Sequence, residues 1–418
     1  MELFDKYGII VWVEIPFVDK PGDNRDAFWE TTKLQLKEMI RQRYNRPSIV
    51  FWGLQNEVST SSYNDIMPAK IAEWCAYVKE EDPTGRLTTQ AQAGTERPSW
   101  TTDVFGQNRY PGWYQSGTYG TYLDGLRSAY TLNGVQLPIG LSEYGAGGNP
   151  YQHEITTLSG TTVPGAPYGH GQPWHPEEYQ SLIHELAIKD INARTWVWGT
   201  FVWNMFDFAS DSRSEGGQPG INDKGLVTHD RKLKKDAFFI YKANWSKDPT
   251  IHIASRRFEE RQTATTPVKM YSNCPDVELF VNGVSQGKKQ NTNANNFILE
   301  WTNVPLSNCG SGDAGNNLII VKGILDGKEY NDTVVWKRRF SSSISLTSSV
   351  LLIDNATRKI SLTSTVNAAN IQQVITPVQG ASFVLVAVDG VTPVTSGYVE
   401  PGMKLNVTAE DGVTKGSV

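Results

Sequence analysis

Short apolar runs alternate with stretches of helical periodicity from residue 1 to about residue 245. The runs predict six strands, at Ile9–Ile15, Ile49–Leu54, Leu87–Gln90, Asp103–Gly106, Pro138–Glu143 and Val197–Trp203. Three stretches between them carry apolar residues at helical spacing, namely 26–44, 66–82 and 176–194. Strands separated by helices of this length pair in parallel, which predicts an α/β fold. Because a closed (β/α)8 TIM barrel needs eight strands, we expect an incomplete barrel that lacks its first two.

Beyond Trp245 the helical periodicity disappears and strands that alternate apolar and polar residues replace it. Asn282-Gly283 and Asp326-Gly327 separate such strands and are hairpin signals. The pattern predicts an immunoglobulin-like β-sandwich, followed by a Ser-rich linker and another β-rich segment. The predicted domains are 1–245, a partial TIM-barrel catalytic domain, 246–340, the β-sandwich, and 345–418, a second β-rich domain that we expect to be truncated.

Composition and charge narrow the classes of partner. The 418 residues have a net charge of −5 and show no basic stripe, which argues against nucleic acid. No apolar run approaches the ~18 residues that a membrane span needs. The three cysteines have no metal-ligand spacing and cannot form a disulfide framework. The 13 Trp, 17 Tyr and 15 Phe supply core material first of all, but this density also suits sugar binding.

The first residues, "MELFDKYGIIVWVEIPF", enter a strand almost at once and carry no signal-peptide pattern. We therefore expect the chain to begin inside a domain. The location of the full-length protein stays unknown, and a periplasmic or secreted enzyme is compatible with the sequence.

Two glutamates stand where predicted strands end. Asn56 and Glu57 follow the apolar run that starts at Ile49, and Glu143 follows Ser142 after another run. In parallel α/β barrels the active site lies at the carboxyl ends of the strands. Hydrolysis of an acetal needs one carboxyl group that donates a proton and a second that attacks or stabilises the sugar cation. Each glutamate alone is more often a helix-terminal or surface charge, so the evidence is the pair.

Other polar and aromatic residues follow the remaining strands. One segment contributes Asn108, Tyr110 and Tyr114, of which Tyr110 could hold a nucleophilic carboxylate ionised, although packed turn aromatics explain such a segment too. Trp203 at a strand end is a candidate sugar platform, with core packing as the alternative. Asn222 and Lys224 lie in a Gly-bounded loop, and most such loops are simply solvated. The histidines show no metal spacing, so we predict no metal ligands.

Four segments, "YNRPSIVFWGLQNE", "PIGLSEYGAGGNPYQHE", "TFVWNMFDFASD" and "GINDKGLVTHDRKLKKDAFFIYKANW", resemble glycoside hydrolase family 2, in the style of the Bacteroides-type β-galactosidases. The resemblance covers residues 1–245 and matches barrel strands three to eight; the family's N-terminal domains and first two strands are missing. It implies a retaining exo-glycosidase that hydrolyses terminal β-D-galactosides by double displacement.

The resemblance also assigns roles residue by residue. Glu57 matches the general acid/base and Glu143 the nucleophile. Asn56 matches the residue that binds the sugar 2-hydroxyl, Tyr110 the tyrosine beside the nucleophile, and Trp203 an aromatic of the sugar pocket. A retaining pair stands about 5–5.5 Å apart. The chemistry requires no cofactor, and Mg²⁺ or Na⁺ enters only because some family galactosidases use it.

Two alternatives stay open. The first is a β-glucuronidase, which would bind the substrate carboxylate through an Asn-x-Lys motif, and Asn222 and Lys224 fit that motif. Against this alternative, we expect such enzymes to carry an Arg a few residues upstream of the Asn, where this chain has Gln218. A carbohydrate-binding fragment without activity would need no glutamate at either strand end. The expected partner is a β-galactoside oligosaccharide or glycoside, and a homo-oligomer remains open.

Overall fold

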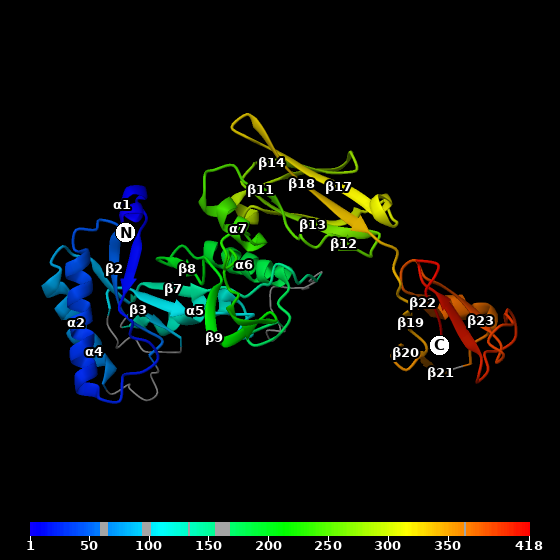
Figure 1. The fold of residues 1–418 in the computed structure, drawn as a ribbon, viewed down its shortest axis with the longest axis horizontal. Helices are drawn as coiled ribbons and strands as arrows, with labels where there is room; N and C mark the ends of the chain where they lie inside the picture. The colour runs from blue at the N-terminus through cyan, green and yellow to red at the C-terminus, as the bar shows by residue number, and fades with distance from the viewer. Residues whose placement is uncertain (59–65, 94–101, 133, 155–167, 363–364) are drawn as a thin grey trace. The chain divides into compact units, whose positions relative to one another are not determined.

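The computed structural model describes residues 1–58, 66–93, 102–132, 134–154, 168–362 and 365–418 (Figure 1). These residues form two compact units. The first contains Met1–Ser255 with Tyr271–Asn273 and Thr292–Ile298, and the second contains Arg256–Met270, Cys274–Asn291 and Leu299–Val418. The predicted domain boundaries near residues 245 and 345 stay predictions.

A six-stranded parallel sheet organises the first unit. Its strands, in spatial order, are β1 (Val11–Glu14), β2 (Ile49–Asn56), β3 (Leu87–Gln92), β4 (Phe105–Asn108), β7 (Ile139–Tyr144) and β8 (Thr200–Val202). All six overlap the predicted strands, so the expectation of an incomplete α/β barrel is confirmed. Since every pair is parallel, the carboxyl ends of all six strands meet at one edge of the sheet.

Helices cover this sheet. The three predicted helices are α2 (Arg25–Arg43), α4 (Met67–Glu81) and α6 (Glu177–Asn192). The chain opens with helix α1 (Glu2–Tyr7). The sequence pattern did not predict two further helices, α5 (Tyr119–Ala129) and α7 (Asp236–Trp245). It also did not predict the hairpin strands β9 (Phe208–Glu215) and β10 (Gln218–Asn222) or the short strands β5 (Thr131–Leu132), β6 (Val135–Gln136) and β11 (Ile251–Ile253).

The packing of α2 and α4 on β2 shows why these segments are helical. Asn24 caps α2 by accepting a hydrogen bond from the Ala27 amide at 3.3 Å, and Leu36 of that helix is fully buried. Trp74 of α4 and Trp52 of β2 are buried in the same core as Leu36. The Trp52 indole donates to Asp82 at 2.8 Å, so this buried polar group is satisfied.

The second unit is built mainly from antiparallel strands, although the short strand β12 pairs with β18 in parallel. A five-stranded sheet has the order β12-β18-β17-β14-β15. The two predicted hairpin turns join its strands, and both central residues of each turn have positive φ, at 51° and 82° for Asn282-Gly283 and 52° and 77° for Asp326-Gly327. The strands to residue 338 are β12 (Glu260–Arg261), β13 (Thr265–Ser272), β14 (Asp276–Val281), β15 (Val284–Gln290), β16 (Ile298–Pro305), β17 (Asn316–Leu325) and β18 (Lys328–Arg338).

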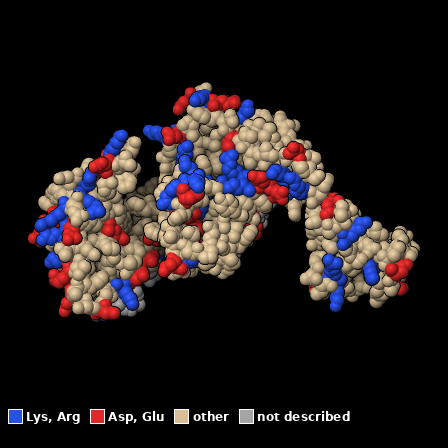
Figure 2. Space-filling model, in the orientation of Figure 1, with Lys and Arg blue, Asp and Glu red and all other residues tan. Residues whose placement is uncertain are grey.

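Residues 341–418 carry short strands around a core of their own, which includes Leu346, Phe383 and Leu405. The elements are β19 (Leu346–Ser348), β20 (Leu352–Asp354), β21 (Lys359–Ser361), α8 (Ile371–Val374), β22 (Ile375–Pro377), β23 (Ser382–Val386), β24 (Lys404–Thr408) and β25 (Lys415–Ser417). Among the described residues, each helix is too short or too polar to cross a bilayer. Lys and Arg side chains are interspersed with Asp and Glu on the face that Figure 2 draws.

Candidate active site

Both candidate carboxyl groups lie at the carboxyl edge of the parallel sheet. Glu57 directly follows β2, and Glu143 is the last residue but one of β7. The Glu57 amide donates to the Ala91 carbonyl of β3 at 3.0 Å, and its φ of 53° is left-handed, a conformation that costs an L-residue roughly 1–2 kcal/mol. Across β4 and β7, Asn108 stands opposite Glu143.

The Asn108 amide connects the two strand ends. Its Nδ2 donates to Glu57 Oε1 at 2.8 Å and to Asn56 Oδ1 at 3.1 Å. Its Oδ1 accepts from the Ser142 hydroxyl at 2.6 Å. With its amide oriented in this way, Asn108 can stabilise an ionised carboxylate on Glu57, and it ties β2, β4 and β7 together at their ends.

Tyr110 supports the second carboxyl group. The buried hydroxyl of Tyr110 donates to Glu143 Oε2 at 2.5 Å. Burial raises the pKa of Glu143 to about 7; the Tyr110 hydrogen bond opposes this shift, the nearby Glu57 carboxyl adds to it, and the Lys224 charge again opposes it. Burial also raises the pKa of Tyr110, so the phenol stays protonated and has a proton to donate to the carboxylate.

One cleft of about 730 Å³ contains both carboxyl groups. This volume is ordinary for a small-molecule site. All nine residues singled out in the sequence line it, namely Asn56, Glu57, Asn108, Tyr110, Tyr114, Glu143, Trp203, Asn222 and Lys224. Their individual roles stay predictions. Trp203 follows β8 with 37% of its surface exposed, and its ring packs edge-on against Phe208 at 6.0 Å, which leaves part of the indole available to a ligand.

Lys224 is buried in the wall of this cleft with 1% of its surface exposed. Its ammonium lies 5.0 Å from the centre of the Trp113 ring and 5.2 Å from that of Tyr114. Among the described residues it has no hydrogen-bond acceptor, and the nearest carboxylate oxygen belongs to Glu215, at 3.8 Å. A buried ammonium without an acceptor is costly unless a ligand supplies one.

Sequence reasoning missed Arg213, which lines the cleft, and its buried partner Glu215, both on β9. Arg213 lines the cleft and donates from Nη1 to Glu215 Oε1 at 2.6 Å and to the Tyr114 hydroxyl at 3.2 Å. Glu215 is fully buried. The only signal in the sequence was the polar stretch "DSRSE" before a Gly-Gly pair, which gives neither a strand nor a site by itself.

Hydrogen bonds from residues that do not line the cleft hold the Asn222-Asp223-Lys224 segment in place. The Lys235 ammonium donates to the Asp223 carbonyl and to Asp207 Oδ1, both at 2.8 Å. Asp207, which is buried, also accepts a hydrogen bond from the Gly225 amide at 2.8 Å. A Cβ on Gly225 would lie 1.9 Å from the Asp207 backbone nitrogen, so only glycine fits there.

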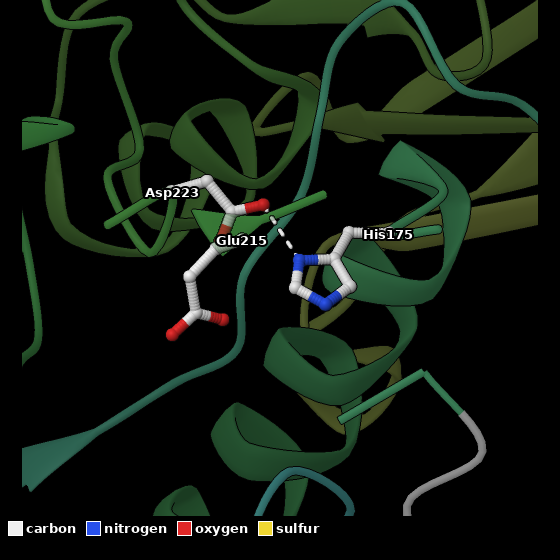
Figure 3. Close-up of side chains that lie close together, drawn as sticks. All are labelled: His175, Glu215 and Asp223. Atoms are coloured by element: carbon white, nitrogen blue, oxygen red, sulfur yellow. Dashed lines mark hydrogen bonds and ion pairs between the residues drawn. The ribbon is translucent and has the colours of Figure 1, made fainter. Parts of the chain in front are cut away.

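One cluster among the described residues offers enough ligand atoms to be tested as a metal site. His175, Glu215 and Asp223 each offer an atom, and these atoms lie within 4.8 Å of one another. Figure 3 shows the Nδ1 of His175 facing Asp223 Oδ2, 2.7 Å away, while the carboxyl group of Glu215 points away from that bond. Since Arg213 and Lys224 already place two positive charges beside Glu215, the cluster does not fit the Mg²⁺ or Na⁺ that the resemblance raised.

Known proteins with similar sequences and structures include several named β-glucuronidases. A β-glucuronidase of Bacteroides fragilis is 43% identical over 329 residues, which cover 77% of this chain and 44% of that protein. The FMN-binding β-glucuronidase of Facaelibacterium prausnitzii L2-6 superposes with a TM-score of 0.69 at 35% identity, over 81% of this chain and 48% of the other. A Bacteroides fragilis protein provisionally named a β-galactosidase gives 0.70 at 32% identity, over 81% and 47%. The chain thus spans less than half the length of these relatives.

The predicted preference for β-galactosides is wrong. The relative at 43% identity and the solved structure at 35% identity are both named β-glucuronidases, and both share more of this sequence than the provisional galactosidase does. The prediction gave weight to the lack of an Arg at Gln218. In the structure another arginine, Arg213, lines the cleft from the neighbouring strand of the hairpin.

Family models match two segments of the chain. A domain of unknown function, DUF4982, matches residues 263–330. The TIM-barrel domain of the glycosyl hydrolases of family 2 matches residues 1–248, more than half of the chain and all of the parallel sheet. The chain therefore belongs to glycoside hydrolase family 2.

Proposed function

We propose that this protein hydrolyses terminal β-D-glucuronides with retention of the anomeric configuration. The observation that carries the proposal is the buried Lys224 ammonium, which lacks a hydrogen-bond acceptor among the described residues and lines the same cleft as Glu57 and Glu143. A glucuronide differs from a neutral glycoside by a carboxylate on the sugar ring. That carboxylate would satisfy Lys224 through a charge-assisted hydrogen bond, with Asn222 beside it.

Glu143 is the proposed nucleophile and Glu57 the proposed acid/base. Glu143 attacks the anomeric carbon while Glu57 gives its proton to the departing glycosidic oxygen, so one C–O bond forms as another breaks. Glu57, now ionised, then takes a proton from water, whose oxygen displaces Glu143 from the sugar. The hydrogen bond from Tyr110 supports this assignment because it favours and orients the carboxylate form of Glu143.

The remaining cleft residues fit positioning roles. Asn56 is assigned to the 2-hydroxyl of the sugar, and Asn108 holds both Asn56 and Glu57 by hydrogen bonds. Trp203 offers a partly exposed ring as a stacking surface for the pyranose. Tyr114 contributes to the wall around Lys224.

Paired substrates test the proposal in the intact protein. We expect kcat/KM for 4-nitrophenyl β-D-glucuronide to exceed that for the galactoside, and Lys224→Gln to lower the glucuronide value roughly 100-fold with a much smaller effect on neutral substrates. Lys232→Gln is the matched control because the Lys232 side chain is 84% exposed and lies outside the cleft. Faster cleavage of the galactoside, or an equal effect of Lys224→Gln on every substrate, would refute the proposal.

The roles of the carboxyl groups need a separate test. Glu143→Gln should abolish turnover. Azide added to Glu143→Ala should restore cleavage of an activated β-glucuronide and give the α-glycosyl azide, because azide then attacks where the nucleophile stood. A β-azide, or activity that survives Glu143→Gln, would remove Glu143 from its role.

A further inference from the structure

The carboxylate of Glu215 is shared between two cations of the cleft wall. Its Oε1 accepts from Arg213 Nη1 at 2.6 Å, while Lys224 Nζ is 3.8 Å from the same oxygen. His170 Nδ1 lies 2.9 Å from it on the outer side. Glu215 has no exposed surface and Lys224 almost none, so water screens these charges weakly.

The charges of this group do not cancel. Arg213 and Lys224 contribute two positive charges, and Glu215 contributes one negative charge. Burial opposes ionisation of Glu215, but the Lys224 charge and the hydrogen bonds from Arg213 and His170 outweigh burial and lower its pKa, so it is ionised at neutral pH. Among these three side chains one positive charge is left over, while the nearby Asp223 carboxylate is paired with His175.

Geometry decides which cation keeps that charge. Arg213 makes the short hydrogen-bonded ion pair with Glu215, whereas the distance to Lys224 is too long for a hydrogen bond. Arg213 is also held by the Tyr114 hydroxyl at 3.2 Å. The Lys224 ammonium lies against the Trp113 and Tyr114 rings and makes no hydrogen bond to the described residues. Its N–H donors therefore stay unused, and it carries most of the excess positive charge.

We propose that Arg213 determines the preference for anionic sugars indirectly, by neutralising Glu215 and so leaving Lys224 available to the carboxylate of the substrate. Arg213 is on this account a positioning residue, which acts through Glu215 and does not itself contact the sugar. The inference rests on the proposed function and deepens it. Without Arg213, Glu215 becomes the counter-ion of Lys224 and competes with the substrate for it.

A double variant separates this account from direct binding of the substrate by Arg213. The readout in the intact protein is the ratio of kcat/KM for 4-nitrophenyl β-D-glucuronide to that for the β-D-glucoside, which carries a neutral CH2OH in place of the carboxylate. Arg213→Gln should lower this ratio roughly 10- to 100-fold, mainly through KM for the glucuronide. Adding Glu215→Gln restores the single excess charge, and we expect it to recover at least roughly tenfold of the loss.

Each outcome decides one question. A double variant as poor as Arg213→Gln alone, or an unchanged ratio in Arg213→Gln, would overturn the indirect mechanism. Arg213→Lys keeps the charge and should retain the ratio within roughly fivefold, which tests the idea even if Arg213→Gln fails to fold; a ratio lost in the folded Lys variant contradicts it. If the unaltered protein itself does not prefer the glucuronide to the glucoside, the proposed function fails, independently of Arg213.

Discussion

Removing the Tyr110 hydroxyl should shift the acidic limb of the pH–activity profile to higher pH. The hydroxyl donates to Glu143 Oε2 at 2.5 Å, and the pKa of Glu143 is raised to about 7 mainly by burial. Tyr110→Phe removes a hydrogen bond that favours the carboxylate and leaves the burial that disfavours it. The nucleophile must be ionised to attack, so a higher pKa of Glu143 means that activity is lost at a higher pH as the pH falls.

The loss of this one hydrogen bond sets the expected size of the pKa shift. A hydrogen bond to a charged group contributes roughly 1.5–3 kcal/mol, and one pKa unit corresponds to about 1.36 kcal/mol. The pKa of Glu143 should therefore rise by roughly one to two units in Tyr110→Phe. At pH 7 the ionised fraction would fall from about half to roughly 1–10%, a loss of roughly 5- to 50-fold in kcat/KM.

The assay is kcat/KM for a chromogenic β-glucuronide between pH 5 and pH 10, with enzyme stability checked at each pH. Tyr122→Phe serves as the control, since the Tyr122 hydroxyl donates to the Ser116 carbonyl at 3.2 Å and Tyr122 is not among the residues that line the cleft. Recovery of Tyr110→Phe activity at high pH, toward the level of the unaltered protein, would support the pKa argument. An acidic limb that stays in place or moves to lower pH would refute it.

Three further predictions concern the framework of the site. Lys235→Met leaves Asp207 buried without its cation and should lower the free energy of unfolding by about 3–5 kcal/mol in urea titrations, whereas the exposed neighbour Lys234→Met should cost less than about 1 kcal/mol; equal effects would contradict this. Gly225→Ala forces a Cβ against the Asp207 backbone and should lower the melting temperature, with a cost of about 1–3 kcal/mol; an unchanged melting temperature would show that the turn relaxes freely. Burial raises the pKa of Glu14 to about 8, so the folded state holds this proton more tightly than the unfolded chain does. The stability that this proton contributes is fully present below the ordinary carboxyl pKa of 4.5 and is lost as the pH rises toward 8. Glu14→Gln should therefore flatten the fall in melting temperature between pH 5 and pH 9, and a parallel fall in both proteins would exclude Glu14 as its source.

Strands buried on both faces could be predicted from the sequence because their apolar runs are continuous. Ile49 to Leu54 is such a run, and the observed strand is two residues longer, ending at Asn56. The hairpin of β9 and β10 could not be predicted in this way. β9 alternates partly buried and exposed positions with polar residues on both sides, so no apolar period marks it. The helix Tyr119–Ala129, with two glycines, was missed for a similar reason, as its composition favours turns.

The candidate carboxyl groups were predictable because topology alone brings parallel strand ends together. The charge of the cleft wall was not, because it depends on the register of a hairpin. Ser214 pairs with Pro219, and the register then shifts before Ala209 pairs with Ile221. This irregular pairing brings Arg213 close to the Asn-x-Lys segment, although nine positions separate it from Asn222 in the sequence. Arg213 thus lies farther upstream than the few residues at which an Arg was expected, and the hairpin folds it back to the cleft.

The middle residue of the Asn-x-Lys segment explains how its two neighbours are held toward the cleft. Asn222 and Lys224 line the cleft, whereas the Asp223 carboxylate accepts a hydrogen bond from His175 at 2.7 Å and is fully buried. The Asp223 carbonyl is held by the Lys235 ammonium at 2.8 Å and the Gly148 amide at 3.1 Å. With both ends of Asp223 fixed, the segment has little freedom to retract Lys224, so the fold imposes the cost of burying that ammonium, and under the proposed function the substrate carboxylate offsets this cost.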